Sequence, residues 1–553
     1  MQVSLKYLGK SGVSGTGDER KISFAPNLAR PKVFFDADVK HPLRYREAMS
    51  ALHDIVVSDL RFKKRSGSEA YKEFLKGRNE AEAKARREAF DEEVKKALLK
   101  EPEPPPLDLD KRFHKMHEKY WKARRAWAAW LSSNDPELFR HLVPCDPVVT
   151  VAPDVVFFEG FAKDESSYGC LLVDRDAFKG DSAGGMGTTN VDYSNALYRQ
   201  IQTLRTYRTT RLVVDPTGFE VNVEGQGDYR EEKIDLPPTW LRAFGQLSAA
   251  TTLPTRSVRL DVGTVYAIIA YLLRHREKKG PRSLRFQLTP GKHPIVTIEP
   301  FGLEVTSSGP LYDGPKPEEI KVWGRRRLTS LARVLPLAEH VDVSLLGSGL
   351  PSIWTAHLGD MRFVLGLSGW TTSDWSSGAG LDLLSGAFDA DPALAKKLDA
   401  HLESVRFAKL ADLEKATGAP EAKLTAALFL LAKQGQAIFD FAHGVYRHRP
   451  VLSVALSDEL LGPEPPELVG ARNIVRSHAV RITKETNAAG LRILVGQVGD
   501  EREVELALDS DGMVKKGRCN CSWHFRFKLR QGPCRHLLAL RMFATTRESA
   551  WRA

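Results

Sequence analysis

The stretch "GRCNCSWHFRFKLRQGPCRHLLALR", from Gly517 to Arg541, holds three of the five cysteines in the chain of 553 residues. Cys519 and Cys521 are one residue apart, as are Cys534 and His536, and Ser522 to Pro533 separate the two pairs. Three thiolates and one imidazole complete a tetrahedral coordination sphere for zinc. Four protein ligands leave no position for a water molecule, so the pattern predicts one structural Zn²⁺ and not a catalytic one.

The residues around the two pairs indicate how such a site is built. The first pair falls on an extended segment, from which both thiols can reach one ion. Gly532-Pro533 turns the chain, and "CRHLLALRMF" follows with helical periodicity. The positive end of this helix favours a thiolate at Cys534. His524, between the pairs, and His478, outside them, are predicted to be ordinary surface or core histidines.

This C-x-C-x(n)-C-x-H pattern resembles the SWIM zinc finger. The segments "RILVGQV" and "EVELALDSDGMVKKGRCNC" resemble the strands that precede the first pair in that family, and "GPCRHLLAL" resembles its final helix. The resemblance covers about residues 472–542. It implies that Cys519, Cys521, Cys534 and His536 bind zinc, and that the domain binds DNA or protein. It also implies a bacterial protein that acts with a MoxR-type AAA+ ATPase, a von Willebrand A protein, or both.

Positive charge is concentrated in the same region. From Arg472 to the end there are sixteen basic and eight acidic residues, an excess of eight within a formal net charge of +11. A basic domain favours a polyanionic partner. A soluble surface with more arginine than aspartate has the same composition, so both interpretations stay open.

Aromatic and basic residues also alternate between the cysteine pairs, in "SWHFRFKLRQG". Aromatic rings can stack on bases while neighbouring cations bind phosphates. The alternative is an ordinary strand with its aromatic residues facing inward. The residues predicted to contact nucleic acid here are Arg518, Arg526, Lys528, Arg530 and Arg535.

Upstream, residues 390–455 contain "KLADLEKATGAPEAKLTAALFLLAKQGQAIFDFAHGVYRHRP". The pattern predicts a short helix, a tight turn, a longer helix and a two-stranded hairpin, which resembles a winged helix-turn-helix. Arg447 and Arg449 on the hairpin are suited to phosphate contacts. The second helix is poor in the arginine and asparagine that base edges favour, so protein docking is preferred over sequence-specific DNA recognition.

An internal repeat organises residues 151–385. "RLVVDPTGFEV" (211–221) and "PIVTIEPFGLEV" (294–305) both predict strand, Pro-x-Gly turn and strand, and a tryptophan-bearing helix follows each. Two copies of an α+β unit, near 205–260 and 288–345, are therefore expected. Such duplication is more typical of a scaffold with a groove than of an enzyme.

Residues 1–150 predict a helix-rich region that contains charged helices. "KVFFDADV" (32–39) favours a strand, and "PLRYREAMSALHDIVVSDLRF" (42–62) favours a helix with proline in its first turn. Acids and bases recur at helical spacing over 68–100, and a tryptophan stripe marks a further helix over 110–131.

Sequence patterns typical of enzymes are missing. The glycine-rich "GDSAGGMGTTN" (180–190) lacks the Gly-Lys-Ser/Thr ending of a phosphate-binding loop, and no H-E-x-x-H, G-x-S-x-G or dinucleotide motif occurs. Asp36 and Asp38 form an isolated acidic pair that supports only a weak enzyme alternative. No apolar run is long enough for a membrane span, and the start of the sequence has no apolar segment typical of a signal peptide. Few cysteines favour a reducing cytoplasm.

Together these features predict a cytoplasmic α+β multi-domain protein. Its expected parts are a helical N-terminal region (1–150), a duplicated α+β scaffold (151–385), a winged helix-turn-helix (390–455) and a small zinc-stabilised SWIM domain (470–553). The expected function is that of a non-catalytic adaptor for nucleic acid, most of all DNA, or for protein. The alternative is a pure protein–protein interaction scaffold.

Overall fold

The computed structural model describes most of residues 5–58 and 147–548, with gaps that include 215–229 and 376–389, and scattered residues between 87 and 134. The chain divides into two units, 1–58 with 145–553 and, separately, 59–144. The charged stretch 68–100 lies outside the described residues except for 87–93, which are helical. In the second unit, Trp127 and Trp130 stack with ring centroids 5.5 Å apart.

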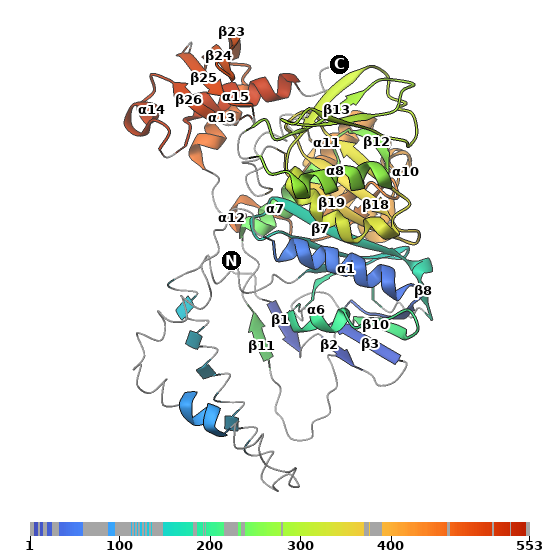
Figure 1. Cartoon of the computed structure of the whole chain (residues 1–553). Coiled ribbons are helices and arrows are strands. Elements are labelled where there is room, and N and C mark those ends of the chain that lie inside the picture. Colours follow the sequence, from blue (N-terminus) through green and yellow to red (C-terminus); the bar gives the residue numbers. More distant parts are fainter. Residues whose placement is uncertain are drawn as a thin grey trace. The chain divides into compact units, whose positions relative to one another are not determined.

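An antiparallel sheet of eight strands organises the larger unit (Figure 1). Its strands are β5 (Val148–Val151), β6 (Val155–Phe161), β7 (Ser167–Asp174), β9 (Gly187–Asn190), β12 (Arg256–Asp261), β17 (His340–Leu345), β18 (Ser352–His357) and β19 (Met361–Leu367). They lie in the order β12-β17-β18-β19-β7-β6-β5-β9. Every residue of β6 is buried, because apolar layers cover both faces of the sheet.

The first layer comprises helices and two smaller sheets. Its helices are α1 (Pro42–Val56), α6 (Asn195–Ile201) and α8 (Val262–Arg274), with the 3-10 turns η1 (Arg175–Ala177), η2 (Arg325–Arg333) and η3 (Leu335–Leu337). Helix α1 crosses β6 and β7 at a pair of glycines, Gly160 and Gly169. A Cβ atom at Gly160 would lie 2.7 Å from Val56 Cγ2, so the missing side chains let the helix approach the sheet closely.

One of these smaller sheets joins the N-terminus to the middle of the chain. Its order is β2 (Gly12–Ser14), β3 (Glu19–Phe24), β10 (Thr209–Val214), β4 (Phe35–Val39) and β8 (Phe178–Lys179). Strand β10 runs parallel to β3 and antiparallel to β4. The first 58 residues are therefore part of the scaffold, which differs from the predicted helix-rich region 1–150, since β3 and β4 are joined through β10, far along the chain.

The two copies of the predicted repeat differ in strand pairing and in the element that carries their tryptophan: Trp240 of the first copy is helical, whereas Trp323 of the second copy lies just before a 3-10 turn. The first copy comprises β10, β11 (Arg230–Lys233), α7 (Pro238–Thr251) and β12; the second comprises β14 (Ile295–Ile298), β15 (Leu303–Thr306), β16 (Glu318–Val322), η2 and β17. Strand β14 pairs with β15 and with β13 (Leu284–Leu288), and β11 pairs with β1 (Leu5–Leu8). The first copy's Pro-x-Gly turn lies outside the described residues.

The second apolar layer contains α7 and a helix–turn–helix segment. This segment comprises α9 (Pro392–Val405), β20 (Phe407–Ala408), α10 (Leu410–Thr417), α11 (Glu421–Lys433), β21 (Ala437–Asp440), β22 (Val445–His448) and α12 (Asp458–Leu461). Its three strands lie in the order β20-β22-β21. A Cβ atom at Gly245 would lie 2.5 Å from the Lys433 carbonyl oxygen, so α7 and α11 touch backbone to backbone.

The C-terminal residues build a four-stranded antiparallel meander with three helices (Figure 1). Its elements are α13 (Pro466–Arg476), β23 (Val480–Ala488), β24 (Leu491–Val498), β25 (Arg502–Leu508), β26 (Val514–Arg518), α14 (Ser522–Phe527) and α15 (Arg535–Glu548). Among the described residues, no helix is long and apolar enough to cross a bilayer. The mixed α+β class expected from the sequence is confirmed.

Candidate metal centre and basic surface

The structure brings the four predicted ligands together. Cys519 follows β26, Cys521 precedes α14, and Cys534 and His536 lie at the start of α15. One ligand atom from each residue lies within 4.8 Å of all the others. The three thiols are buried, and His536 is half-buried. These residues can hold one metal ion.

Helices α14 and α15 position the ligands, and α13 supports α15. Cys521 caps α14, because its Sγ accepts a hydrogen bond from the backbone N–H of His524 at 3.4 Å. Glu467 of α13 accepts bonds from the Arg535 backbone N–H at 2.6 Å and from Arg535 Nη2 at 2.8 Å. This carboxylate therefore holds the first turn of α15, where Cys534 and His536 lie.

Cys519 and Cys534 share one proton through a hydrogen bond, and this position suits a cation. A hydrogen bond from Cys534 lowers the pKa of Cys519 to about 3, and the same bond raises the pKa of Cys534. Cys519 is thus held as a thiolate close to a second sulfur, and its Sγ lies 3.7 Å from His536 Nδ1. A divalent ion that prefers sulfur and nitrogen would replace the shared proton, so the donor set fits the group that it is expected to bind.

The two neighbouring histidines stay outside the cluster. His524 is buried in the small core and contributes no ligand atom to the group of four. His478 is exposed. Both placements agree with the prediction that they are ordinary histidines.

The segment between the cysteine pairs begins with a helix, α14, where the alternative interpretation expected a strand. Trp523 and Phe527 lie one turn apart and pack edge to face, with ring centroids 4.9 Å apart. Phe525 points elsewhere and is 80% exposed. Lys528 Nζ lies 5.8 Å from the centroid of the Phe525 ring. The helix thus separates one solvent-facing aromatic ring from two that pack together.

The predicted basic contacts in this domain fall into two groups. Arg518, Arg526, Lys528 and Arg530 are exposed. Arg535 is also partly exposed, but its guanidinium is paired with Glu467 at 2.8 Å. Arg535 therefore holds α13 against the start of α15, where two of the four potential metal ligands lie, and the other four residues form the exposed basic surface.

The structure contradicts the two phosphate contacts that were predicted on the hairpin, Arg447 and Arg449. Arg447 and Arg449 are 1% and 0% exposed, so neither side chain can meet a phosphate. Arg447 donates to both carboxylate oxygens of Asp154 at 2.8 Å and to Asp440 at 2.7 Å. Arg449 lies 3.5 Å from the buried carboxylate of Glu159. Their partners in β6 and in the turn before it are almost 300 residues away, and no local sequence pattern indicates them.

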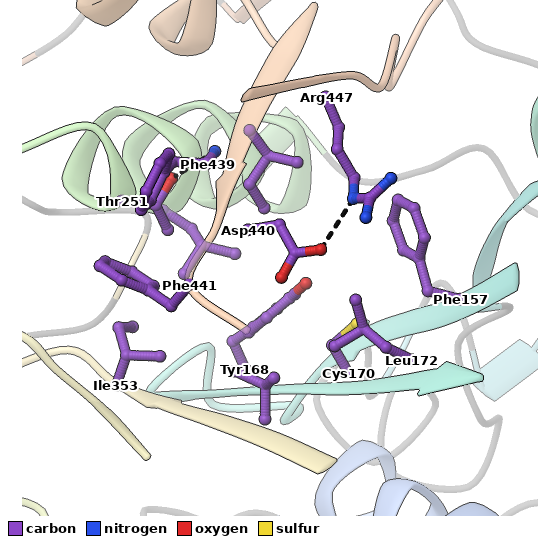
Figure 2. Close-up of a pocket in the computed structure, with 13 residues that line it drawn as sticks. Phe157, Tyr168, Cys170, Leu172, Thr251, Ile353, Phe439, Asp440, Phe441 and Arg447 are labelled. Atoms are coloured by element: carbon purple, nitrogen blue, oxygen red, sulfur yellow. Dashed lines mark hydrogen bonds and ion pairs between the residues drawn. The ribbon is translucent and has the colours of Figure 1, made fainter. Parts of the chain in front are cut away.

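The hairpin packs against the eight-stranded sheet over an apolar pocket. Figure 2 shows Tyr168, Cys170 and Phe157 on the sheet side, opposite Phe439 and Asp440 of β21. Burial raises the pKa of the Cys170 thiol, which is therefore neutral. The pocket lining is apolar apart from Tyr168, Thr251 and the Asp440–Arg447 ion pair. Apolar packing and paired charges therefore join the hairpin to the sheet.

A histidine strengthens the same contact in a pH-dependent way. His443 Nε2 lies 3.0 Å from Asp174 of β7, and its Nδ1 lies 2.7 Å from Asp440. These hydrogen bonds raise the pKa of His443 from 6.5 to about 9. Protonated His443 stabilises this contact fully at pH values below 6.5, the pKa of the histidine in the unfolded chain. The stabilisation is lost as the pH rises through about 9, its pKa in the folded chain.

We expect hydrogen exchange of Ala437–His448 to accelerate between pH 6.5 and 9, after correction for the intrinsic rate. The local free energy of opening should fall by about 2 kcal/mol, a value that allows for partial solvent screening. His443→Gln should remove this dependence. Equal slopes in the wild type and the variant would contradict the assignment.

The acidic pair at the N-terminus is not part of a cluster. Asp36 accepts hydrogen bonds from Arg211 Nε and Nη2, both at 2.7 Å. Among the residues that the structure describes, no group of metal-binding side chains includes Asp36 or Asp38. The enzyme alternative gains no support from them.

Comparisons with known proteins give no family. No protein-family model matches the sequence, and no curated protein matches it. Among solved structures, the proliferating cellular nuclear antigen of Entamoeba histolytica is 14% identical, with a TM-score of 0.29. The match covers 40% of this chain and 89% of the Entamoeba chain. The PCNA2-PCNA3 complex of Sulfolobus tokodaii is 11% identical over the same shares, with a TM-score of 0.28. Similarities at this level carry no argument about function.

Proposed function

We propose that this protein is a non-catalytic, zinc-binding adaptor whose C-terminal domain is a SWIM-type zinc finger that binds nucleic acid, with DNA as the first candidate. One observation carries the proposal: Phe525 is 80% exposed on a helix capped by Cys521, one of the four clustered potential metal ligands. Exposed Arg526 lies on the same helix, exposed Lys528 follows its last residue, and exposed Arg518 ends the preceding strand β26.

This combination supports binding to a single strand in particular. An exposed aromatic ring can stack on a base, and each such contact contributes roughly 1–3 kcal/mol. Nearby cations neutralise phosphates and release counterions, so binding should weaken steeply with salt. Cys521 caps the helix and belongs to the metal centre, which holds the ring and the cations in a fixed arrangement.

The helix–turn–helix segment has another role in this proposal. We assign it a winged-helix fold that docks within the chain. Helix α11 is buried on most of its surface, with Leu424, Leu428 and Leu431 in the core, and the hairpin charges are paired with the scaffold. Beyond its exposed first turn, the helix is buried or half-buried along its length, which is typical of an interior element and not of a DNA-reading one.

Substituting Phe525 with alanine should weaken binding to single-stranded DNA about 10-fold or more, since the stacking surface is lost. Arg526→Glu with Lys528→Glu should weaken binding further and reduce its salt dependence. Fluorescence anisotropy with single-stranded DNA, double-stranded DNA and RNA across a salt series measures both effects. Arg481→Glu is the matched control, because Arg481 is exposed on β23 of the same domain.

The contrary outcome defines the second candidate. If the full chain binds none of the three nucleic acids at low salt, the domain is a protein-docking module. An exposed aromatic ring beside arginines is also typical of protein interfaces. The partner proposed from the family resemblance is a MoxR-type AAA+ ATPase or a von Willebrand A protein. Capture of such a partner by the wild type but not by Phe525→Ala would support this function.

A further inference from the structure

Three potential metal ligands meet on the face of the large sheet, in a different part of the chain from the cysteine centre. His340 and Asp342 lie two residues apart on β17, so their side chains leave the same face of the strand. His357 of β18 is the direct cross-strand neighbour of His340. The antiparallel register therefore brings both imidazoles and the carboxylate to one place.

Their geometry is compact. The two imidazole rings stack with centroids 4.2 Å apart and an interplanar angle of 17°. Both Nε2 atoms face the same oxygen, because Asp342 Oδ2 lies 3.0 Å from His357 Nε2 and 3.7 Å from His340 Nε2. One ligand atom from each residue lies within 4.8 Å of the others.

A neighbouring arginine holds the carboxylate in position. Arg259 of β12 donates from Nε to Asp342 Oδ1 at 2.7 Å and from Nη2 to Asp342 Oδ2 at 3.0 Å. Each carboxylate oxygen has two acceptor positions, so Oδ2 keeps one for a second contact. Arg259 thus orients the carboxylate as the partners of metal ligands commonly do, and fixes its oxygen between the two rings.

The histidine nitrogens point to a ligand that the protein itself does not supply. Among the described residues, Nε2 of His340 and Nε2 of His357 are both screened from solvent, and neither makes a hydrogen bond of regular geometry, although both face Asp342 Oδ2 at 3.7 and 3.0 Å. Buried polar atoms in folded proteins normally have a partner. The side chains themselves remain partly exposed, at 24% and 16%, so an ion has access from solvent.

We propose that His340, Asp342 and His357 form a second metal site, for a divalent transition-metal ion of the zinc type. Ligand atoms at about 2.0–2.2 Å from one tetrahedral ion are about 3.3–3.6 Å apart. The distances of 3.0 and 3.7 Å bracket this separation, so small side-chain rotations are sufficient. Three protein ligands leave a coordination position open for water or an anionic group, unlike the four ligands of the cysteine centre.

The experiment is a titration of Zn²⁺ into the full chain after the cysteine centre has been loaded with zinc. Calorimetry should show one further site in the wild type. His357→Gln and His340→Gln should each weaken that site about 100-fold or more, a loss at least as large as those seen for outer-shell changes. His401→Gln is the matched control, because His401 lies on α9 outside the cluster, and it should bind as the wild type does.

Two further measurements decide the result. Circular dichroism shows whether each variant is folded, and Co²⁺ in place of the second Zn²⁺ reports the ligand type. Weak visible bands without sulfur-to-metal charge transfer are expected, because this site has no thiolate. The proposal is overturned if the wild type takes up no further zinc, or if the folded His340→Gln and His357→Gln variants bind it unchanged.

Discussion

Replacing Cys521 with serine is expected to release the metal and unfold the C-terminal domain while the rest of the chain stays folded. Cys519, Cys521 and Cys534 belong to the domain's own core, next to Leu506 and Leu537. Structural zinc in small domains contributes an apparent 10–16 kcal/mol, about the whole stability of such a unit. Loss of one thiolate also removes the cap of α14.

Hydrogen exchange followed by mass spectrometry measures this effect by region. Protection should disappear from β23 to α15 and persist in the eight-stranded sheet. Metal analysis of the same samples should show zinc in the wild type and none in Cys521→Ser. Cys170→Ser is the matched control, because Cys170 is a buried thiol in β7 and should leave the metal in place. Retained zinc in Cys521→Ser would show that the four residues are not the ligand set.

Arg449→Met is expected to destabilise the contact between the helix–turn–helix segment and the sheet by about 3–5 kcal/mol, the usual cost of breaking a buried ion pair from one side. Glu159 and Arg449 are both 0% exposed. Without the guanidinium, the Glu159 carboxylate keeps only the hydrogen bond from Tyr168, at 2.7 Å. It must then stay charged without a cation or take up a proton.

The double variant Glu159→Gln/Arg449→Met separates pairing from packing. It should recover much of the lost stability, because no buried charge remains. Arg211→Met is the surface control, since Arg211 pairs with Asp36 but its side chain is 55% exposed, and it should cost less than about 1 kcal/mol. Urea denaturation with hydrogen exchange of β6 and β22 measures all three. Equal effects of Arg449→Met and Arg211→Met would contradict the buried-pair argument.

The cluster of four potential metal ligands could be predicted from sequence because its information is local. Cys519 to His536 span a short stretch, and spacing, turn and helix start all agree on one arrangement. The same holds for α10, α11 and the hairpin, whose turns at Gly418 and Gly444 have positive φ angles of 69° and 65°. Glycine adopts this backbone conformation at little cost, so its position in the sequence predicts the turn.

Helix α14 and the exposed Phe525 were only half predictable. Alternating aromatic and basic residues fit a strand as well as a short helix, because a segment of six residues is too brief for its period to decide. The Cys521 cap decides in favour of the helix. That cap requires the Cys521 thiol to be held in place beside Cys519, Cys534 and His536, which is a property of the tertiary structure.

Tertiary structure alone decided the remaining features. Arg447 and Arg449 have the composition of a phosphate-binding wing, yet Asp154 and Glu159 bury and neutralise them. His340 and His357 meet only through the register of β17 and β18. The sequence by itself determined the cysteine centre, the basic C-terminal domain and the α+β class, since these depend on near neighbours and composition. The burial of Arg447 and Arg449 depends on partners almost 300 residues away, and the meeting of His340 with His357 depends on the exact register of two neighbouring strands, and no local pattern encodes either.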